Sequence, residues 1–159
     1  MAELKPGDPA PAFTVDTDKG KPLSLADLAG HKVILYAYPA AFTPGCSLEA
    51  QDFRDAFKWF DQAGYTILGL SPDPVDKNAS FAQKMKLPFT LLSDPDHAVL
   101  ESYGAWGERE AFGRTTVGVI RSTFVIGGDG RIEVAEYRVK AAGHVERLAA
   151  ELGVELEGF

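Results

Sequence analysis

The sequence has a single cysteine, Cys46, among 159 residues. A lone cysteine excludes an internal disulfide, a zinc site built from several thiolates and a C-x-x-C redox pair. If Cys46 carries out thiol chemistry, the second sulfur must therefore come from another molecule.

Positive charge and long hydrophobic runs are also scarce. Sixteen basic residues against twenty-three acidic ones give a net charge of −7 and an isoelectric point near 4.9, so nucleic acids and anionic membranes are not predicted partners. No run approaches the roughly 18 apolar residues of a membrane span. Residues 1–13 lack the charged and apolar regions of a signal peptide. We therefore expect a cytoplasmic protein.

Motifs for cofactors and metals are missing as well. The sequence has no G-x-S-x-G elbow and no phosphate-binding glycine loop, and its three histidines, His31, His97 and His144, are widely separated. Cys46 has no nearby histidine or second cysteine to complete a metal site. The sequence therefore predicts no cofactor and no metal. A Cys–His hydrolase is a weak alternative, because histidines in turns and helices are more often exposed or capping than catalytic.

Short apolar segments alternate with helical ones, without repeats or a linker, and the length fits one domain covering residues 1–159. This alternation indicates a mostly parallel α/β sheet, and GGDG at 127–130 predicts a hairpin that adds an antiparallel edge. The opening of the chain is Pro-rich and expected to be irregular. The predicted strands are 32–38, 65–70, 89–92, 122–126 and 131–139, and the predicted helices are 44–61, 75–86, 98–103 and 144–152.

The residues around Cys46 predict a helix start. Thr43 is a favourable N-cap, and Pro44 suits the first helical position because its missing N–H would have no helical partner there. Cys46 then lies in the first turn, where free N–H groups and the helix dipole favour a thiolate over a thiol. It also shares a helical face with Ala50 and Phe53, so its side chain should lean toward the core. A buried cysteine that acts only as a small hydrophobic residue stays an open alternative from the local sequence alone.

Residues 39–46, PAAFTPGC, match the P-x-x-x-T-x-x-C motif and resemble the peroxiredoxins, in particular the peroxiredoxin Q or bacterioferritin comigratory protein subfamily. The resemblance covers nearly the whole chain, and several motifs in the family's order are more specific than any single one. It implies a single thioredoxin-like domain, with a central mixed β-sheet flanked by helices. The other matching segments are GDPAPAF at 7–13, LSLADLAGHKVILYAYP at 23–39, YGAWGE at 103–108, RSTFVI at 121–126 and KAAGHVERL at 140–148.

By this resemblance the protein is a thiol-dependent peroxidase that reduces hydrogen peroxide and organic hydroperoxides through a cysteine sulfenic acid. Cys46 would be the nucleophile, and Thr43 and Arg121 match the family positions that hold the peroxide oxygens. The backbone N–H of Gly45 would add a donor, and Pro39 would keep water off the thiolate. Plain structural roles are the alternatives: an N-cap for Thr43, a strand end for Pro39 and a surface ion pair for Arg121.

Two further side chains, Glu49 and Trp106, are assigned less directly. Glu49 lies one turn after Cys46, where an unpaired carboxylate would disfavour the thiolate, so we predict that it pairs with an arginine and orients Arg121. A carboxylate on a solvated helix face is the alternative. Trp106 is expected to pack in the core or a loop, or to form a wall of the pocket.

The chain departs from the subfamily in one respect. Many members carry a resolving cysteine five residues after the nucleophile, but here that residue is Gln51 and no other cysteine exists. Oxidised Cys46 must then be attacked by an external thiol, from thioredoxin, glutaredoxin, a low-molecular-weight thiol or a second copy of the chain. We expect a monomer or a weak homodimer. The alternative function is a noncatalytic peroxide sensor or partner-binding module with a thioredoxin fold, which measured turnover would distinguish.

Overall fold

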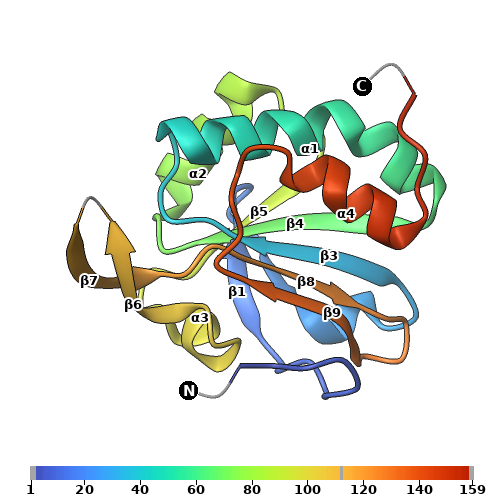
Figure 1. The fold of residues 1–159 in the computed structure, drawn as a ribbon, viewed down its shortest axis with the longest axis horizontal. Coiled ribbons are helices and arrows are strands. Elements are labelled where there is room, and N and C mark those ends of the chain that lie inside the picture. The colour runs from blue at the N-terminus through green and yellow to red at the C-terminus, as the bar shows by residue number, and fades with distance from the viewer. Residues whose placement is uncertain (1–2, 112, 158–159) are drawn as a thin grey trace.

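A seven-stranded β-sheet forms the centre of the molecule (Figure 1). The computed structural model describes residues 3–111 and 113–157. The strand order is β2-β1-β5-β4-β3-β8-β9. These strands are β1 (Thr14–Thr17), β2 (Pro22–Ser24), β3 (Lys32–Ala37), β4 (Tyr65–Ser71), β5 (Thr90–Ser93), β8 (Ser122–Ile126) and β9 (Ile132–Tyr137).

Helices cover both faces of this sheet. Three lie together on one face, and the shorter two lie on the other (Figure 1). All the helices and strands predicted from the sequence form, with ends that differ by no more than two residues. The first group is α1 (Pro44–Gln62), α2 (Val75–Met85) and α4 (His144–Leu152), and the second is α3 (Ala98–Ser102) and the 3₁₀ helix η1 (Leu25–Leu28).

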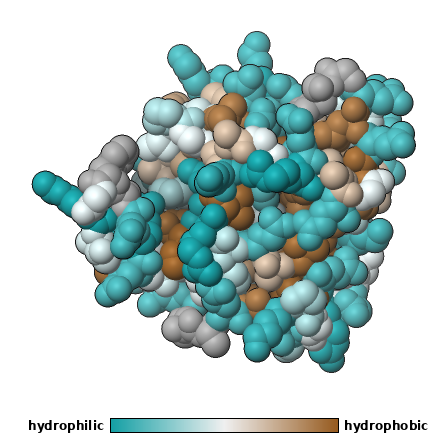
Figure 2. All heavy atoms as spheres, in the orientation of Figure 1, coloured by the Kyte–Doolittle hydropathy of each residue, from teal (hydrophilic) through white to brown (hydrophobic). Residues whose placement is uncertain are grey.

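The two faces of the sheet carry separate hydrophobic cores. Successive side chains of a strand point to opposite faces, so Ile34 and Tyr36 of β3 pack beneath α1 and α4, whereas Val33 and Leu35 pack toward α3. Because β3 is buried on both sides, its sequence is a continuous apolar run. On the visible surface, hydrophilic residues dominate and hydrophobic ones occur in small separated patches (Figure 2).

The sheet is mixed, as expected, but the prediction of a mostly parallel sheet is wrong. In the described part of the chain, only the β3–β4 and β4–β5 pairs are parallel. The β1–β2, β1–β5, β3–β8 and β8–β9 pairs are antiparallel. Helices α1 and α2 act as crossovers for the parallel pairs, whereas β8 follows α3 and an extra hairpin and enters beside β3 in the opposite direction.

Two regions that were expected to be irregular contain strands. The Pro-rich opening forms the β1–β2 hairpin, in which Thr14 pairs with Ser24. The segment around 103–108, expected as a loop, leads into a second hairpin made of β6 (Trp106–Ala111) and β7 (Arg114–Val119). This hairpin forms its own two-stranded sheet and projects beside the main one (Figure 1). Within the described residues, no helix is both long and apolar enough to cross a membrane.

Candidate active site

Cys46 lies in the first turn of α1, directly after the turn that leaves β3. Thr43 is the N-cap residue, with an extended backbone, and Pro44 is the first helical residue, as predicted. The first helical hydrogen bond runs from the Ser47 N–H to the Thr43 carbonyl oxygen at 2.8 Å. The N–H groups of Gly45 and Cys46 precede this bond in the first turn and therefore have no intrahelical acceptor.

The side chain of Cys46 is buried, with 1% of its surface exposed. It belongs to the core that also contains Tyr36, Tyr38, Ala50 and Phe53. The sulfur thus lies in a mainly apolar environment, where a negative charge needs a nearby partner. That partner is a guanidinium, because Arg121 Nη2 donates a hydrogen bond to Cys46 Sγ at 3.3 Å.

Arg121 lies just before β8 and bridges Cys46 and Glu49. Its Nη1 donates to Glu49 Oε1 at 2.6 Å, so the predicted pairing of Glu49 with an arginine is present. Glu49 is fully buried, and the solvated helix face proposed as its alternative is wrong. One guanidinium thus joins two acidic groups on successive turns of α1.

Burial and charge act in opposite directions on this pair. Burial raises the pKa of Glu49 to about 7, although the charge and hydrogen bond of Arg121 act to lower it. Burial lowers the pKa of Arg121, but the adjacent Glu49 and Cys46 outweigh that effect and raise it above its ordinary value. Among the described residues, Glu49 Oε2 has no hydrogen-bond partner. Arg121 therefore stays charged and supplies a fixed positive potential at the sulfur.

The close approach of Arg121 requires a small residue at position 45. A Cβ atom on Gly45 would lie 3.2 Å from Arg121 Nη2, the same nitrogen that bonds Cys46 Sγ. A larger side chain would push the guanidinium away from the sulfur. Gly45 thus contributes space in addition to its free N–H.

The hydroxyl of Thr43 does not cap the helix, which corrects the expected side-chain N-cap role. Its Oγ1 instead donates to the Ala40 carbonyl oxygen at 2.7 Å. Thr43 is exposed, so the lone pairs of its hydroxyl remain accessible to a molecule that approaches α1. Pro39, at the start of the same turn, is partly buried and lines a pocket together with Arg121.

This pocket has a volume of about 640 Å³ and lies between the β6–β7 hairpin and Arg121. Arg109 and Arg138 add positive charge to its lining, and Glu108 and Glu110 add negative charge. No local sequence pattern marked Arg109, because its approach to Arg121 depends on the β6–β7 hairpin, which the sequence did not predict. Arg138 directly follows β9 and reaches the pocket from the other side, and no motif singled it out. Trp106, considered as a pocket wall, instead stacks on His97 with ring centroids 4.0 Å apart.

The histidines do not pair with Cys46. His144 is buried, which corrects the expectation of an exposed or capping residue, and its Nε2 lies 2.8 Å from Thr123 Oγ1. Burial and the positive charges of Arg147 and Arg121 lower the pKa of His144 to about 4. In the described residues, no group of three or more His, Cys, Asp or Glu side chains has a geometry that would hold a metal.

Known proteins with similar sequences place this geometry in a family. Residues 6–135 match the model of the AhpC/TSA family. A relative from Mycobacterium tuberculosis that carries a peroxiredoxin name is 53% identical over 151 residues, covering 95% of this chain and 96% of that protein. Peroxiredoxin Bcp of Escherichia coli K12 is 42% identical over 144 residues, covering 91% and 92% of the two chains.

Solved structures that resemble this chain carry names from the same family as its sequence relatives. The bacterioferritin comigratory protein of Xanthomonas campestris, solved in work on its alkyl peroxide reduction, has a TM-score of 0.83 and 34% identity, covering 89% of this chain and 90% of that one. Peroxidoxin BcpB of M. tuberculosis also has a TM-score of 0.83 and 34% identity, covering 95% and 97%. The chain therefore belongs to the AhpC/TSA family, among the thioredoxin-fold peroxiredoxins of the peroxiredoxin Q or Bcp type.

Proposed function

We propose that this chain is a thiol-dependent peroxidase that reduces hydrogen peroxide and organic hydroperoxides, with Cys46 as the nucleophile. The observation that carries the proposal is the single Arg121 guanidinium that bonds both Cys46 Sγ and Glu49 Oε1. Its charge stabilises a thiolate in an apolar core and also stabilises the negative charge that develops along the S–O–O line. The peroxidase relatives of this chain support the same chemistry.

In the first step the Cys46 thiolate attacks one oxygen of the hydroperoxide R–O–O–H. The S–O bond forms as the O–O bond breaks, the sulfur loses two electrons, and the leaving oxygen takes a proton to become an alcohol or water. Arg121 and the N–H groups of Gly45 and Cys46 donate to the peroxide oxygens. The Thr43 hydroxyl, whose own proton is directed to Ala40, accepts the peroxide O–H.

Pro39 and Glu49 support this step without touching the peroxide bond. Pro39 limits the approach of water to the sulfur, because it has no N–H to hold a water molecule and its ring is rigid. Glu49 holds the guanidinium in the plane that reaches the sulfur, because Arg121 uses Nη1 for the carboxylate and Nη2 for the thiolate.

The oxidised Cys46 requires an external thiol, since the chain has no second cysteine. An incoming thiolate attacks the sulfenic sulfur and releases hydroxide, and a second thiol then reduces the mixed disulfide. Thioredoxin, glutaredoxin and low-molecular-weight thiols are chemically competent. We favour a low-molecular-weight thiol, because the sulfur is 1% exposed and the adjacent pocket of about 640 Å³ has the size of a small-molecule site.

A catalyst that consumes thiols needs a reducing compartment, so we propose that the protein is cytoplasmic. We also propose that it is a monomer or a weak homodimer.

The functional test treats the protein and its Cys46→Ser variant with one equivalent of hydrogen peroxide and measures intact mass. We expect one added oxygen atom on the wild type and none on the variant. Turnover with a panel of thiols then separates an enzyme from a noncatalytic sensor, which would be oxidised without being recycled.

A further inference from the structure

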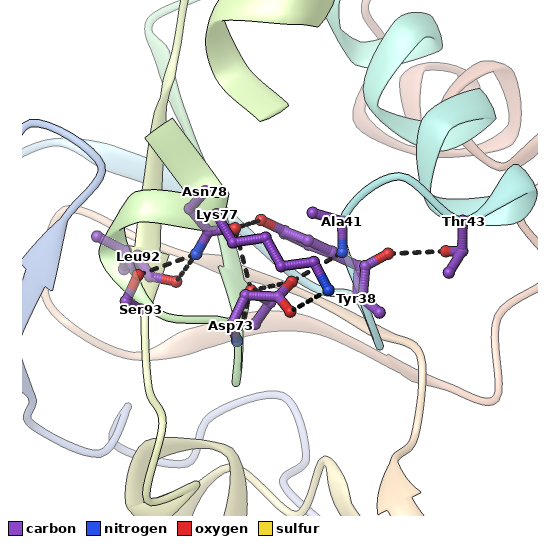
Figure 3. A network of polar contacts seen from close by, with 10 residues as sticks. Tyr38, Ala41, Thr43, Asp73, Lys77, Asn78, Leu92 and Ser93 are labelled. Atoms are coloured by element: carbon purple, nitrogen blue, oxygen red, sulfur yellow. Dashed lines mark hydrogen bonds and ion pairs between the residues drawn. The ribbon is translucent and has the colours of Figure 1, made fainter. Parts of the chain in front are cut away.

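The turn that joins β3 to α1 is held by a buried carboxylate from a distant part of the chain. The N–H of Ala41 donates to Asp73 Oδ2 at 2.7 Å (Figure 3). Asp73 lies 32 residues later, between β4 and α2, and only 7% of its surface is exposed. Because Ala41 is itself buried, loss of this acceptor would leave its N–H without a partner.

This turn has a conformation that its own sequence does not favour. Phe42 has a φ of +67°, in the left-handed region that bulky residues rarely adopt. Its ring is 49% exposed and contacts Phe81 edge-on, with the centroids 5.2 Å apart. A backbone of this kind persists only where neighbouring groups hold it. The hydrogen bond from Ala41 to Asp73 is adjacent to Phe42 and comes from outside the turn.

The oxygens of Asp73 are fixed in turn by their own partners. Lys77 Nζ lies 3.1 Å from Oδ1, and Ser71 Oγ lies 3.1 Å from Oδ2. The neighbouring Asn78 accepts a hydrogen bond from the Tyr38 hydroxyl at 2.6 Å and donates to Ser93 Oγ at 3.0 Å (Figure 3). The network therefore connects the end of β3 to β4, α2 and β5, which all lie later in the sequence than the turn.

We propose that Asp73 is a positioning residue for the peroxide site. By binding the Ala41 N–H, its carboxylate fixes the turn that places Pro39 on one side and Thr43 on the other beside Cys46. Asp73 touches neither the sulfur nor the peroxide. The inference rests on the proposed function, because it assigns Asp73 to the same peroxide reaction.

The test compares three variants of the full-length chain. Asp73→Ala removes the acceptor of the Ala41 N–H, and Asp73→Asn keeps an oxygen that can accept it while losing the charge. Lys77→Met is the matched control, because it removes the ion pair and leaves the Ala41 hydrogen bond in place. For each protein, the second-order rate constants of Cys46 with hydrogen peroxide and with iodoacetamide are measured at one pH.

Iodoacetamide needs a thiolate but not the groups that hold a peroxide, so the ratio of the two rate constants reports peroxide positioning. We expect this ratio to fall about 10-fold or more in Asp73→Ala, because displacements near 1 Å have large effects on oriented reactions. In Asp73→Asn and Lys77→Met it should stay within about 3-fold of the wild-type ratio. Amide exchange at Ala41 should accelerate in Asp73→Ala alone.

A ratio within about 2-fold of wild type in Asp73→Ala, or an equal fall in Lys77→Met, would overturn the positioning role. If Asp73→Ala does not fold, Asp73→Glu replaces it, because the added methylene moves the carboxylate while keeping its charge. An unchanged ratio and unchanged Ala41 exchange in that variant would also overturn the role. Absence of any wild-type reaction with peroxide would instead refute the proposed function, so the two failures are distinguishable.

Discussion

Replacing Glu49 with glutamine should make the protein more stable and its Cys46 less reactive with peroxide. Glu49 is fully buried, and Arg121 Nη1 donates a hydrogen bond to its Oε1 at 2.6 Å. The substitution keeps the size of the side chain and an oxygen that can accept from Arg121. It removes the buried negative charge, whose solvation is lost on folding.

The magnitude follows from the two pKa values of the carboxyl group. Burial raises the pKa of Glu49 from 4.5 to about 7 in the folded state. A carboxyl with a raised pKa binds its proton more tightly when folded, so its contribution to stability is greatest at low pH. That contribution is lost as the pH rises from 4.5 through 7, and it amounts to about 3 kcal/mol. The glutamine variant has no such titration.

The free energy of unfolding is measured by urea titration of the wild type and Glu49→Gln between pH 4.5 and 8. We expect the variant to gain about 3 kcal/mol relative to the wild type across this range. Glu155→Gln, at an exposed position, is the control and should show no gain. The rate of Cys46 oxidation should nevertheless fall about 10-fold in Glu49→Gln, because a neutral amide holds the Arg121 guanidinium less firmly.

A stability difference between the two proteins that is flat with pH, or that falls as the pH rises, would refute a raised pKa of Glu49 in the folded state. A variant that is oxidised as fast as the wild type would show that Glu49 has no part in orienting Arg121. Titrating groups that do not interact with Glu49 cancel in the difference, since they are common to both proteins.

Three further outcomes follow from the same geometry. Because the pKa of buried His144 is lowered to about 4, the wild type should lose about 3 kcal/mol of its free energy of unfolding as the pH falls from 6.5 to 4. His144→Gln should lack this loss when both proteins are unfolded in urea. Gly45→Ala should slow peroxide oxidation about 10-fold in stopped-flow assays, since its Cβ would lie 3.2 Å from Arg121 Nη2, while α1 stays intact. Sulfenic Cys46 should react faster with 3-mercaptopropionate than with cysteamine at equal thiolate concentration, and Arg109→Gln combined with Arg138→Gln should reduce that preference, because the pocket arginines attract a carboxylate.

The sequence predicted the elements of the fold better than their arrangement. Strands such as 32–38 and helices such as 144–152 have a local hydrophobic pattern that their burial requires, so they could be found from the sequence. The direction of β8 beside β3 depends on how the chain returns after α3, which no local pattern records. The β6–β7 hairpin was missed because its polar, partly exposed sequence, WGEREA, lacks the apolar signal of a buried strand.

The candidate site was predictable where the chemistry is local. The N-cap position of Thr43, the first-turn position of Cys46 and the family motif lie within a few residues of one another. The pairing of Glu49 was predicted from an electrostatic requirement, since an unpaired carboxylate one turn from Cys46 would disfavour the thiolate. Asp73 was missed because its contact with Ala41 spans 32 residues and gives no sequence signal.

These distant contacts explain how the proposed polar reaction is compatible with an apolar core. Cys46 shares its core with the rings of Tyr36, Tyr38 and Phe53, whose apolar faces offer little stabilisation to a charge. Two polar groups brought into this environment are held by others from distant parts of the chain: Arg121 by Glu49, and the Ala41 N–H by Asp73. The burial of the Glu49 charge lowers stability, and the same charge pairs with the guanidinium that the proposed reaction uses. Substitutions that relieve such costs are therefore expected to stabilise the protein and slow its chemistry together.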